Sequence, residues 1–115
     1  MKDAAWVRLQ ILHTLFTAGG GHYGGALSCV EILMLLMDLI QERQQKKGIR
    51  DKFILSKGHA AVTYYTLLAR LGEFPEGELS SFGNAGSRLQ GHPDMRSLAS
   101  IDFTTGSLGQ GLSVG

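Results

Sequence analysis

Apolar residues recur at helical spacing over the first part of the chain. Two neighbouring stripes are visible there, one made of Trp6, Leu9, His13 and Phe16 and the other of Val7, Ile11 and Leu15. Asp3 can cap the first turn, and the run Gly19-Gly20-Gly21 ends the pattern. The spacing therefore predicts an amphipathic helix that starts at Asp3 and ends at about Thr17.

A second helical pattern follows a cluster of glycines. Ser28 and Glu31 form the sequence Ser-x-x-Glu, which is typical of a capping box at the start of a helix. The apolar residues after it cover nearly all sides of a helix: Val30, Ile32, Leu33, Leu35, Leu36, Leu39 and Ile40. The chain becomes polar over residues 41–47, and Gly48 can stop the helix. We expect this helix to be mostly buried.

The rest of the pattern predicts shorter elements. Phe53-Ile54-Leu55 is the one convincing strand, and it leads through Ser-Lys-Gly-His59 into a predicted helix over 60–71 that Gly72 caps. A short helix is predicted over 76–82, a loop over 83–94, and the first turns of a helix over 108–115. An α/β sheet usually has about four strands or more. We therefore expect a part of a larger unit, completed by another chain or by further sequence.

Composition and charge narrow the class of protein. The 115 residues are enough for one small domain, and 11 basic against 10 acidic residues give a net charge of +1. A net charge this small gives no strong positive potential that would attract nucleic acid. The sequence also lacks a basic amphipathic helix and a long apolar run, so it gives no indication of a membrane protein. The single cysteine, Cys29, cannot form an internal disulfide, and no signal peptide is recognised. A reduced, buried thiol in a cytoplasmic protein is the expectation.

The candidate chemistry lies at glycine-flanked histidines. Of the four histidines, His22, His59 and His92 have glycine neighbours, and a glycine-rich run follows from Gly106 to Gly111. Glycine lets a backbone approach a ligand closely, and imidazole donates, accepts or transfers a proton near neutral pH. The pattern predicts that three imidazoles and bare backbone face one ligand. His13 has no glycine neighbour and is interpreted as structural.

Each motif taken alone leaves alternatives open. His59, after a strand and before a helix, is placed either to contact an anion at the helix N-terminus or to lie exposed beside a turn glycine. The run from Gly106 is either a phosphate-cradling loop or a tight turn, and it matches neither a Walker A loop nor Gly-x-Gly-x-x-Gly. The separations of the histidines, 37 and 33 residues, lack the close pair that zinc sites favour. Cys29 at a helix start is a nucleophile in principle, but a buried small residue is the stronger interpretation.

Taken together, the motifs resemble the N-terminal portion of the transketolase family. They are Gly-His22-x-Gly, Phe-Ile-Leu-Ser-x-Gly-His59, Gly-His92-Pro and Thr-Thr-Gly106-Ser-Leu-Gly-Gln-Gly, in the order and approximate spacing of the family. The resemblance covers residues 1–115, nearly the whole chain. The form Leu-Ser-Lys-Gly-His-Ala is similar to transketolases that are encoded as separate halves.

The resemblance implies an enzyme that uses thiamine diphosphate. It implies an α/β fold, here the helix-rich beginning of a pyrophosphate-binding domain with few parallel strands, incomplete on its own. The implied reaction transfers a two-carbon ketol unit from a ketose phosphate to an aldose phosphate. The resemblance thus implies a role in carbohydrate metabolism, in the pentose phosphate pathway. His59 is expected at the diphosphate and substrate side, His22 and His92 in the substrate channel, and Gly106, Ser107 and Leu108 against the cofactor.

Departures from the family pattern qualify these expectations. Tyr23 stands where the family usually has proline, and Gly20 where it usually has serine. The family binds Mg²⁺ through residues beyond the Gly106 run, so no metal ligand is expected in this chain. We expect an inactive isolated chain that needs complementary transketolase chains in a homo- or hetero-oligomer. The alternatives are a non-catalytic interaction or regulatory module and a related ketol transferase similar to deoxyxylulose-phosphate synthase.

Overall fold

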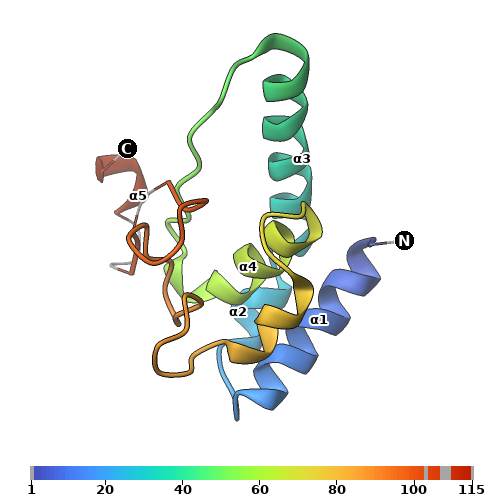
Figure 1. Ribbon diagram of the computed structural model, residues 1–115, viewed down its shortest axis with the longest axis vertical. Helices are drawn as coiled ribbons and strands as arrows, with labels where there is room; N and C mark the ends of the chain where they lie inside the picture. The colour runs from blue at the N-terminus through green and yellow to red at the C-terminus, as the bar shows by residue number, and fades with distance from the viewer. Residues whose placement is uncertain (1, 103, 107–109, 115) are drawn as a thin grey trace.

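The computed structural model is rich in helix. The structure describes residues 2–102, 104–106 and 110–114, and within them no strand is present. In chain order the elements are α1 (Ala4–Thr17), α2 (Tyr23–Leu27), α3 (Val30–Lys47), the 3₁₀ helix η1 (Gly58–Ala60), α4 (Ala61–Arg70), the 3₁₀ helix η2 (Glu76–Ser81) and α5 (Gly111–Val114) (Figure 1). Among the helices so described, none is long and apolar enough to cross a membrane.

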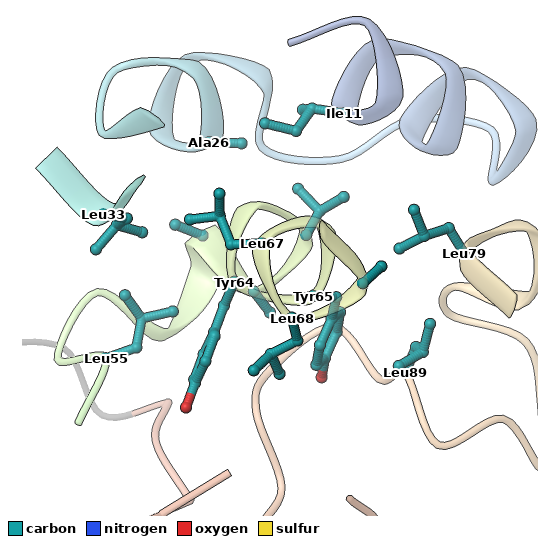
Figure 2. Close-up of a cluster of buried hydrophobic side chains, with 14 of the residues drawn as sticks. Ile11, Ala26, Leu33, Leu55, Tyr64, Tyr65, Leu67, Leu68, Leu79 and Leu89 are labelled. Atoms are coloured by element: carbon teal, nitrogen blue, oxygen red, sulfur yellow. The ribbon is translucent and has the colours of Figure 1, made fainter. Parts of the chain in front are cut away.

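Helix α4 is the centre of the fold. Every residue from Ala61 to Ala69 is buried, and α1, α2, α3 and η2 all pack against this helix. Figure 2 shows side chains from these elements, among them Ile11, Ala26, Leu33 and Leu79, pointing toward the residues of α4. The predicted helix over 60–71 is confirmed, and Gly72 follows it with a φ of +86°. A helix buried on all sides is the support on which the loops of the site rest.

Helix α1 confirms its predicted start and end. The Asp3 carboxylate accepts a hydrogen bond from the Trp6 amide at 3.0 Å, and the glycines after Ala18 have positive φ. Of the two apolar stripes, only that of Val7, Ile11 and Leu15 is buried. His13, interpreted as structural, is exposed and is not part of the buried core.

Helix α3 starts differently from the prediction. Cys29 is its N-cap, and no side chain caps it. Ser28 lies at the end of α2 instead, where its hydroxyl donates to Gly25 O at 3.2 Å. Glu31 forms an ion pair with Arg8 of α1. The predicted capping box is therefore wrong, because a short helix that the sequence pattern did not indicate ends at Ser28. Gly48 ends α3 in the left-handed conformation, as predicted.

The outer face of α3 is exposed rather than buried. Only Val30, Leu33 and Met37 are buried on this helix. Four large apolar side chains remain between 42% and 63% exposed: Ile32, Leu35, Leu36 and Leu39. Within the described ranges no element covers this face, and the far half of α3 extends away from the other helices (Figure 1). The expectation of a mostly buried helix is therefore wrong for this chain.

The segment Phe53-Ile54-Leu55 is not a strand in the structure. A strand needs a neighbouring extended segment to pair with, and the described residues provide none. The Phe53 amide donates instead to the Asp102 carboxylate at 2.7 Å, and the Phe53 ring packs edge-on against Tyr64 with centroids 5.0 Å apart. The helix-rich part of the predicted fold is confirmed, whereas the few parallel strands are not found in this part of the domain.

The segments after α4 follow the prediction more closely. The short helix predicted over 76–82 is the 3₁₀ helix η2, and no regular element occurs over 83–94. Helix α5 covers Gly111–Val114, a shorter range than the predicted 108–115, of which Leu108, Gly109 and Gly115 lie outside the described residues. After η2 the chain runs back toward residues 56–59, and α5 lies next to them (Figure 1).

Candidate functional site

Two of the glycine-flanked histidines are in direct contact. His22 is the N-cap of α2, His59 lies in η1, and their rings meet edge to face with centroids 5.1 Å apart. Gly25 of α2 permits this contact, because a Cβ at that position would lie 2.9 Å from Cδ2 and Nε2 of His59. A side chain there would displace the imidazole.

The third histidine meets the glycine-rich run. A Cβ on Gly106 would lie 3.7 Å from the imidazole carbons of His92. A Cβ on Gly58 would lie 2.9 Å from both Gly106 N and Thr105 Oγ1, so the run is in contact with the residue before His59. The structure thus brings His22, His59, His92 and Gly106 into one cluster, which we call the histidine cluster. Ser107 and Leu108, also predicted to contact the cofactor, lie outside the described residues.

The histidine cluster holds two buried polar atoms without a hydrogen-bond partner. They are His59 Nδ1 and Thr105 Oγ1, for which no acceptor or donor lies within reach in the described part of the chain. Buried polar atoms in folded proteins almost always have a partner, because leaving one unsatisfied costs about 1–3 kcal/mol. Two such atoms in segments that contact each other through Gly58 indicate a site for a polar ligand.

The environment of His59 favours its neutral form. Burial is the largest cause that lowers the pKa of His59 below its ordinary value of 6.5, and the positive charges of His22, Lys57 and His92 lower it further. A neutral imidazole has one nitrogen that donates and one that accepts a hydrogen bond. His59 can therefore bind an anionic oxygen or exchange a proton near neutral pH.

Hydrogen bonds to α4 and between loops fix the position of His92. The Tyr65 hydroxyl donates to Gln90 O at 2.7 Å and to His92 O at 3.3 Å. The Thr105 amide donates to Pro93 O at 3.2 Å, which joins the His92 loop to the segment before Gly106. The Gly111 amide donates to the Ser56 hydroxyl at 3.1 Å and attaches α5 to the segment before His59.

Sequence reasoning missed several residues of the histidine cluster. The pattern assigns no role to Gly25 or Tyr65, and Lys57 and Thr105 occur in it only as members of motifs. Their contacts span large separations, such as the 32 residues between Lys57 and Gly25. A local signal for Gly25 exists, because it is adjacent to Gly24 and close to His22, but the pattern does not indicate which glycine the imidazole approaches.

In the part of the chain that the structure describes, neither a metal site nor an activated thiol accompanies the cluster. Across residues 2–102, 104–106 and 110–114, no group of three His, Cys, Asp or Glu side chains could hold a metal ion. Cys29 is partly buried, and burial raises the pKa of its thiol. A raised pKa disfavours the thiolate, which agrees with the interpretation of Cys29 as a small apolar residue, but the side chain is partly buried rather than buried as expected.

Comparison with known proteins identifies the family. Residues 2–115 match the family described as "Transketolase, thiamine diphosphate binding domain". This match covers nearly the whole chain and agrees with a cluster of imidazoles and glycine backbone that suits an anionic cofactor. The chain belongs to the transketolase family, in its thiamine diphosphate-binding domain.

Individual relatives are similar over almost the full chain. A 6-deoxy-6-sulfo-D-fructose transketolase subunit of a Clostridium species is 41% identical over 110 residues, which cover 93% of this chain and 40% of that protein. An apulose-4-phosphate transketolase subunit from Phocaeicola vulgatus is 36% identical over 111 residues, with coverage of 94% and 39%. The transketolase of Pongo abelii is 38% identical over 118 residues, with coverage of 99% and 19%. The chain thus spans less than half the length of each of these relatives.

Proposed function

We propose that residues 1–115 form the first part of the pyrophosphate-binding domain of a transketolase that uses thiamine diphosphate. The proposed reaction moves a two-carbon ketol unit from a ketose phosphate to an aldose phosphate. The observation that carries this proposal is the convergence of His22, His59, His92 and Gly106 in the histidine cluster. The family match and the relatives named transketolase support it.

The residues of the cluster fit a diphosphate group. His59 Nδ1 and Thr105 Oγ1 have no partner and can serve as polar contacts, and Gly106 leaves exposed backbone without a side chain. We infer that His59 binds the diphosphate side and that Gly106, with Ser107 and Leu108, contributes backbone contacts. When bound, the cofactor supplies a nucleophilic thiazolium carbon that carries the ketol unit between sugars.

The other two imidazoles suit the substrate. His22 and His92 are exposed, whereas His59 is partly buried. An exposed imidazole beside a cofactor site can hydrogen-bond sugar hydroxyls and move a proton at the reacting carbonyl. We therefore assign His22 and His92 to the substrate and His59 to the boundary between substrate and diphosphate.

The proposed enzyme needs more protein than this chain provides. Mg²⁺ is proposed to be held by residues outside the chain, and the α/β sheet to be completed by further strands beside Phe53–Leu55. The exposed apolar face of α3 supports such a completion, because contiguous apolar surface marks an interaction site. Complementary chains in a homo- or hetero-oligomer fit the two relatives that are named as subunits. We place the assembly in the cytoplasm.

Calorimetry of the isolated chain with thiamine diphosphate and Mg²⁺ tests whether further protein is needed for cofactor binding. We expect no saturable binding, because a doubly charged diphosphate held without its metal ligands binds poorly. Tight binding at one cofactor per chain would show that the 115 residues already make a complete site, and the proposal of complementary chains would fail.

A further inference from the structure

Lys57 connects the segment that carries His59 to the helix that follows His22. Its Nζ donates to Gly25 O at 2.8 Å and to the Ser28 hydroxyl at 2.9 Å. Ser28 in turn donates to the same Gly25 carbonyl at 3.2 Å. The ammonium therefore binds the last turn of α2, where carbonyl groups point outward without partners in the helix. Gly25 is also the residue on which the His59 imidazole rests.

A second link fastens the same turn to α4. The Thr63 hydroxyl donates to Ala26 O at 2.7 Å, and both residues are fully buried. Thr63 fixes the inner side of the turn, whereas Lys57 fixes the side that faces the histidine cluster. Because His22 is the N-cap of α2, the placement of this five-residue helix decides whether the His22 ring reaches His59.

The charge of Lys57 is not balanced by an acid in the described residues. Nine of the 11 basic residues form ion pairs there: Lys2, Arg8, Arg43, Lys46, Arg50, Lys52, Arg70, Arg88 and Arg96. The two others are Lys47, at the exposed end of α3, and Lys57. Of these two cations, only Lys57 is partly buried, and its Cε and the Cδ2–Nε2 edge of His59 lie around the same position at Gly25.

We propose that Lys57 is a positioning residue, which holds α2 against the Ser56–His59 segment and so keeps His22 in ring contact with His59. Its unbalanced ammonium also adds positive potential on the side of the cluster where an anion binds. The positioning follows from the contacts of the free chain. Only its use for the diphosphate rests on the function proposed above.

The histidine titrations of the ¹⁵N-labelled chain, read by NMR without ligand, test this proposal. The groups whose positive charge lowers the pKa of His59 are Lys57, His22 on α2 and His92 on its loop. Lys57→Met removes one of them, so the pKa of His59 should rise toward its ordinary value. The nuclear Overhauser cross-peaks between the His22 and His59 rings should weaken, because α2 loses its link. Lys57→Arg keeps the charge and the donors and should retain both signals.

Lys47→Met is the matched control, since it removes a cation that also lacks an ion pair among the described residues, and it should change neither signal. Unchanged ring cross-peaks in Lys57→Met would overturn the positioning role, even with a raised pKa of His59. If Lys57→Met does not fold, the parent chain still decides. Cross-peaks between the Lys57 ε-methylene and the Gly25 α-protons are expected, since Cε lies 3.6 Å from where a Gly25 Cβ would be, and their absence would refute the contact.

A second experiment distinguishes this inference from the proposed function: inorganic pyrophosphate is added to the complete assembly, and the His59 signals are measured. Positioning by Lys57 is read without ligand, so it can fail while pyrophosphate still shifts the His59 signals. Conversely, an assembly in which pyrophosphate shifts none of these signals would contradict the proposed anion site and leave the ligand-free result intact.

Discussion

Gly25 is a residue at which the histidine cluster is tightly packed. The place of its absent Cβ is 2.9 Å from the His59 ring, closer than side-chain carbons normally approach. Its neighbour Gly24 lies in the same short helix, but nothing is within 4 Å of the corresponding position there. Substituting each glycine by alanine therefore changes helix propensity in both cases, but only the substitution at Gly25 adds a contact with the imidazole.

Gly25→Ala should displace the His59 ring and break its contact with His22, while Gly24→Ala should leave the contact intact. Alanine favours a helix over glycine by up to about 1 kcal/mol, so Gly24→Ala should be neutral or stabilising. Ring cross-peaks and urea unfolding of both variants measure the two effects. If Gly25→Ala keeps the ring contact and matches Gly24→Ala in stability, the packing described here is incorrect.

At the residue scale, the sequence predicts the histidines of the site but not their supports. Glycine neighbours distinguish His22, His59 and His92 from His13, and the structure brings those three together. Thr105 and Lys57 give no such local sign, since a buried hydroxyl and a bridging ammonium are defined only by residues far along the chain. The catalytic and cofactor roles of all these residues stay predictions.

At the element scale, helices with complete local signals are predicted well. Helix α1 has its Asp3 cap, its apolar stripe and its terminal glycines, and each is observed. The Ser28 capping box fails because the same residue ends α2, a helix of five residues with two glycines and little propensity of its own. The strand at Phe53–Leu55 fails for another reason, because pairing depends on segments that the described residues do not include.

Helix α3 has a buried face and an exposed face, and substitutions on the two faces should differ in their effect on stability. Leu33→Ala should destabilise the chain by about 3 kcal/mol, because Leu33 is buried against the core and its removal leaves a cavity. Leu35→Ala, two residues along the same helix, should change the free energy of unfolding by less than about 0.5 kcal/mol, since Leu35 is 62% exposed. Urea unfolding of both variants provides the comparison.

Leu35→Ala should also reduce self-association of the isolated chain, measured by sedimentation, because it removes apolar surface from an uncovered face. Leu33→Ala has no such surface to remove and should not reduce it. A large loss of stability in Leu35→Ala would mean that this face is already packed within the chain, contrary to its exposure.

At the scale of the whole molecule, the chain has a hydrophobic core and, in addition, apolar faces that no described element covers. Helix α4 and its neighbours form the hydrophobic core, part of which Figure 2 shows, and α2 and η1, which adjoin His22 and contain His59, pack against α4. The outer faces of α1 and α3 carry exposed apolar residues, including Phe16 at 81% and Leu35 at 62%. The single predicted strand leads to the expectation of a part of a larger unit; the structure does not contain that strand, but the short span of the chain relative to its relatives agrees with the expectation.

The most direct test of the central claim replaces the matching segment of the Clostridium protein, 41% identical over 110 residues, with this chain and assembles it with the remaining chains of that enzyme. Ketol transfer is then measured for the parent graft, for His59→Ala and for His13→Ala, which changes an exposed histidine outside the cluster. We expect activity in the parent graft and in His13→Ala, and a loss of at least about 100-fold in His59→Ala, the range of one general acid–base or charge-stabilising group. Full activity in His59→Ala would contradict the account.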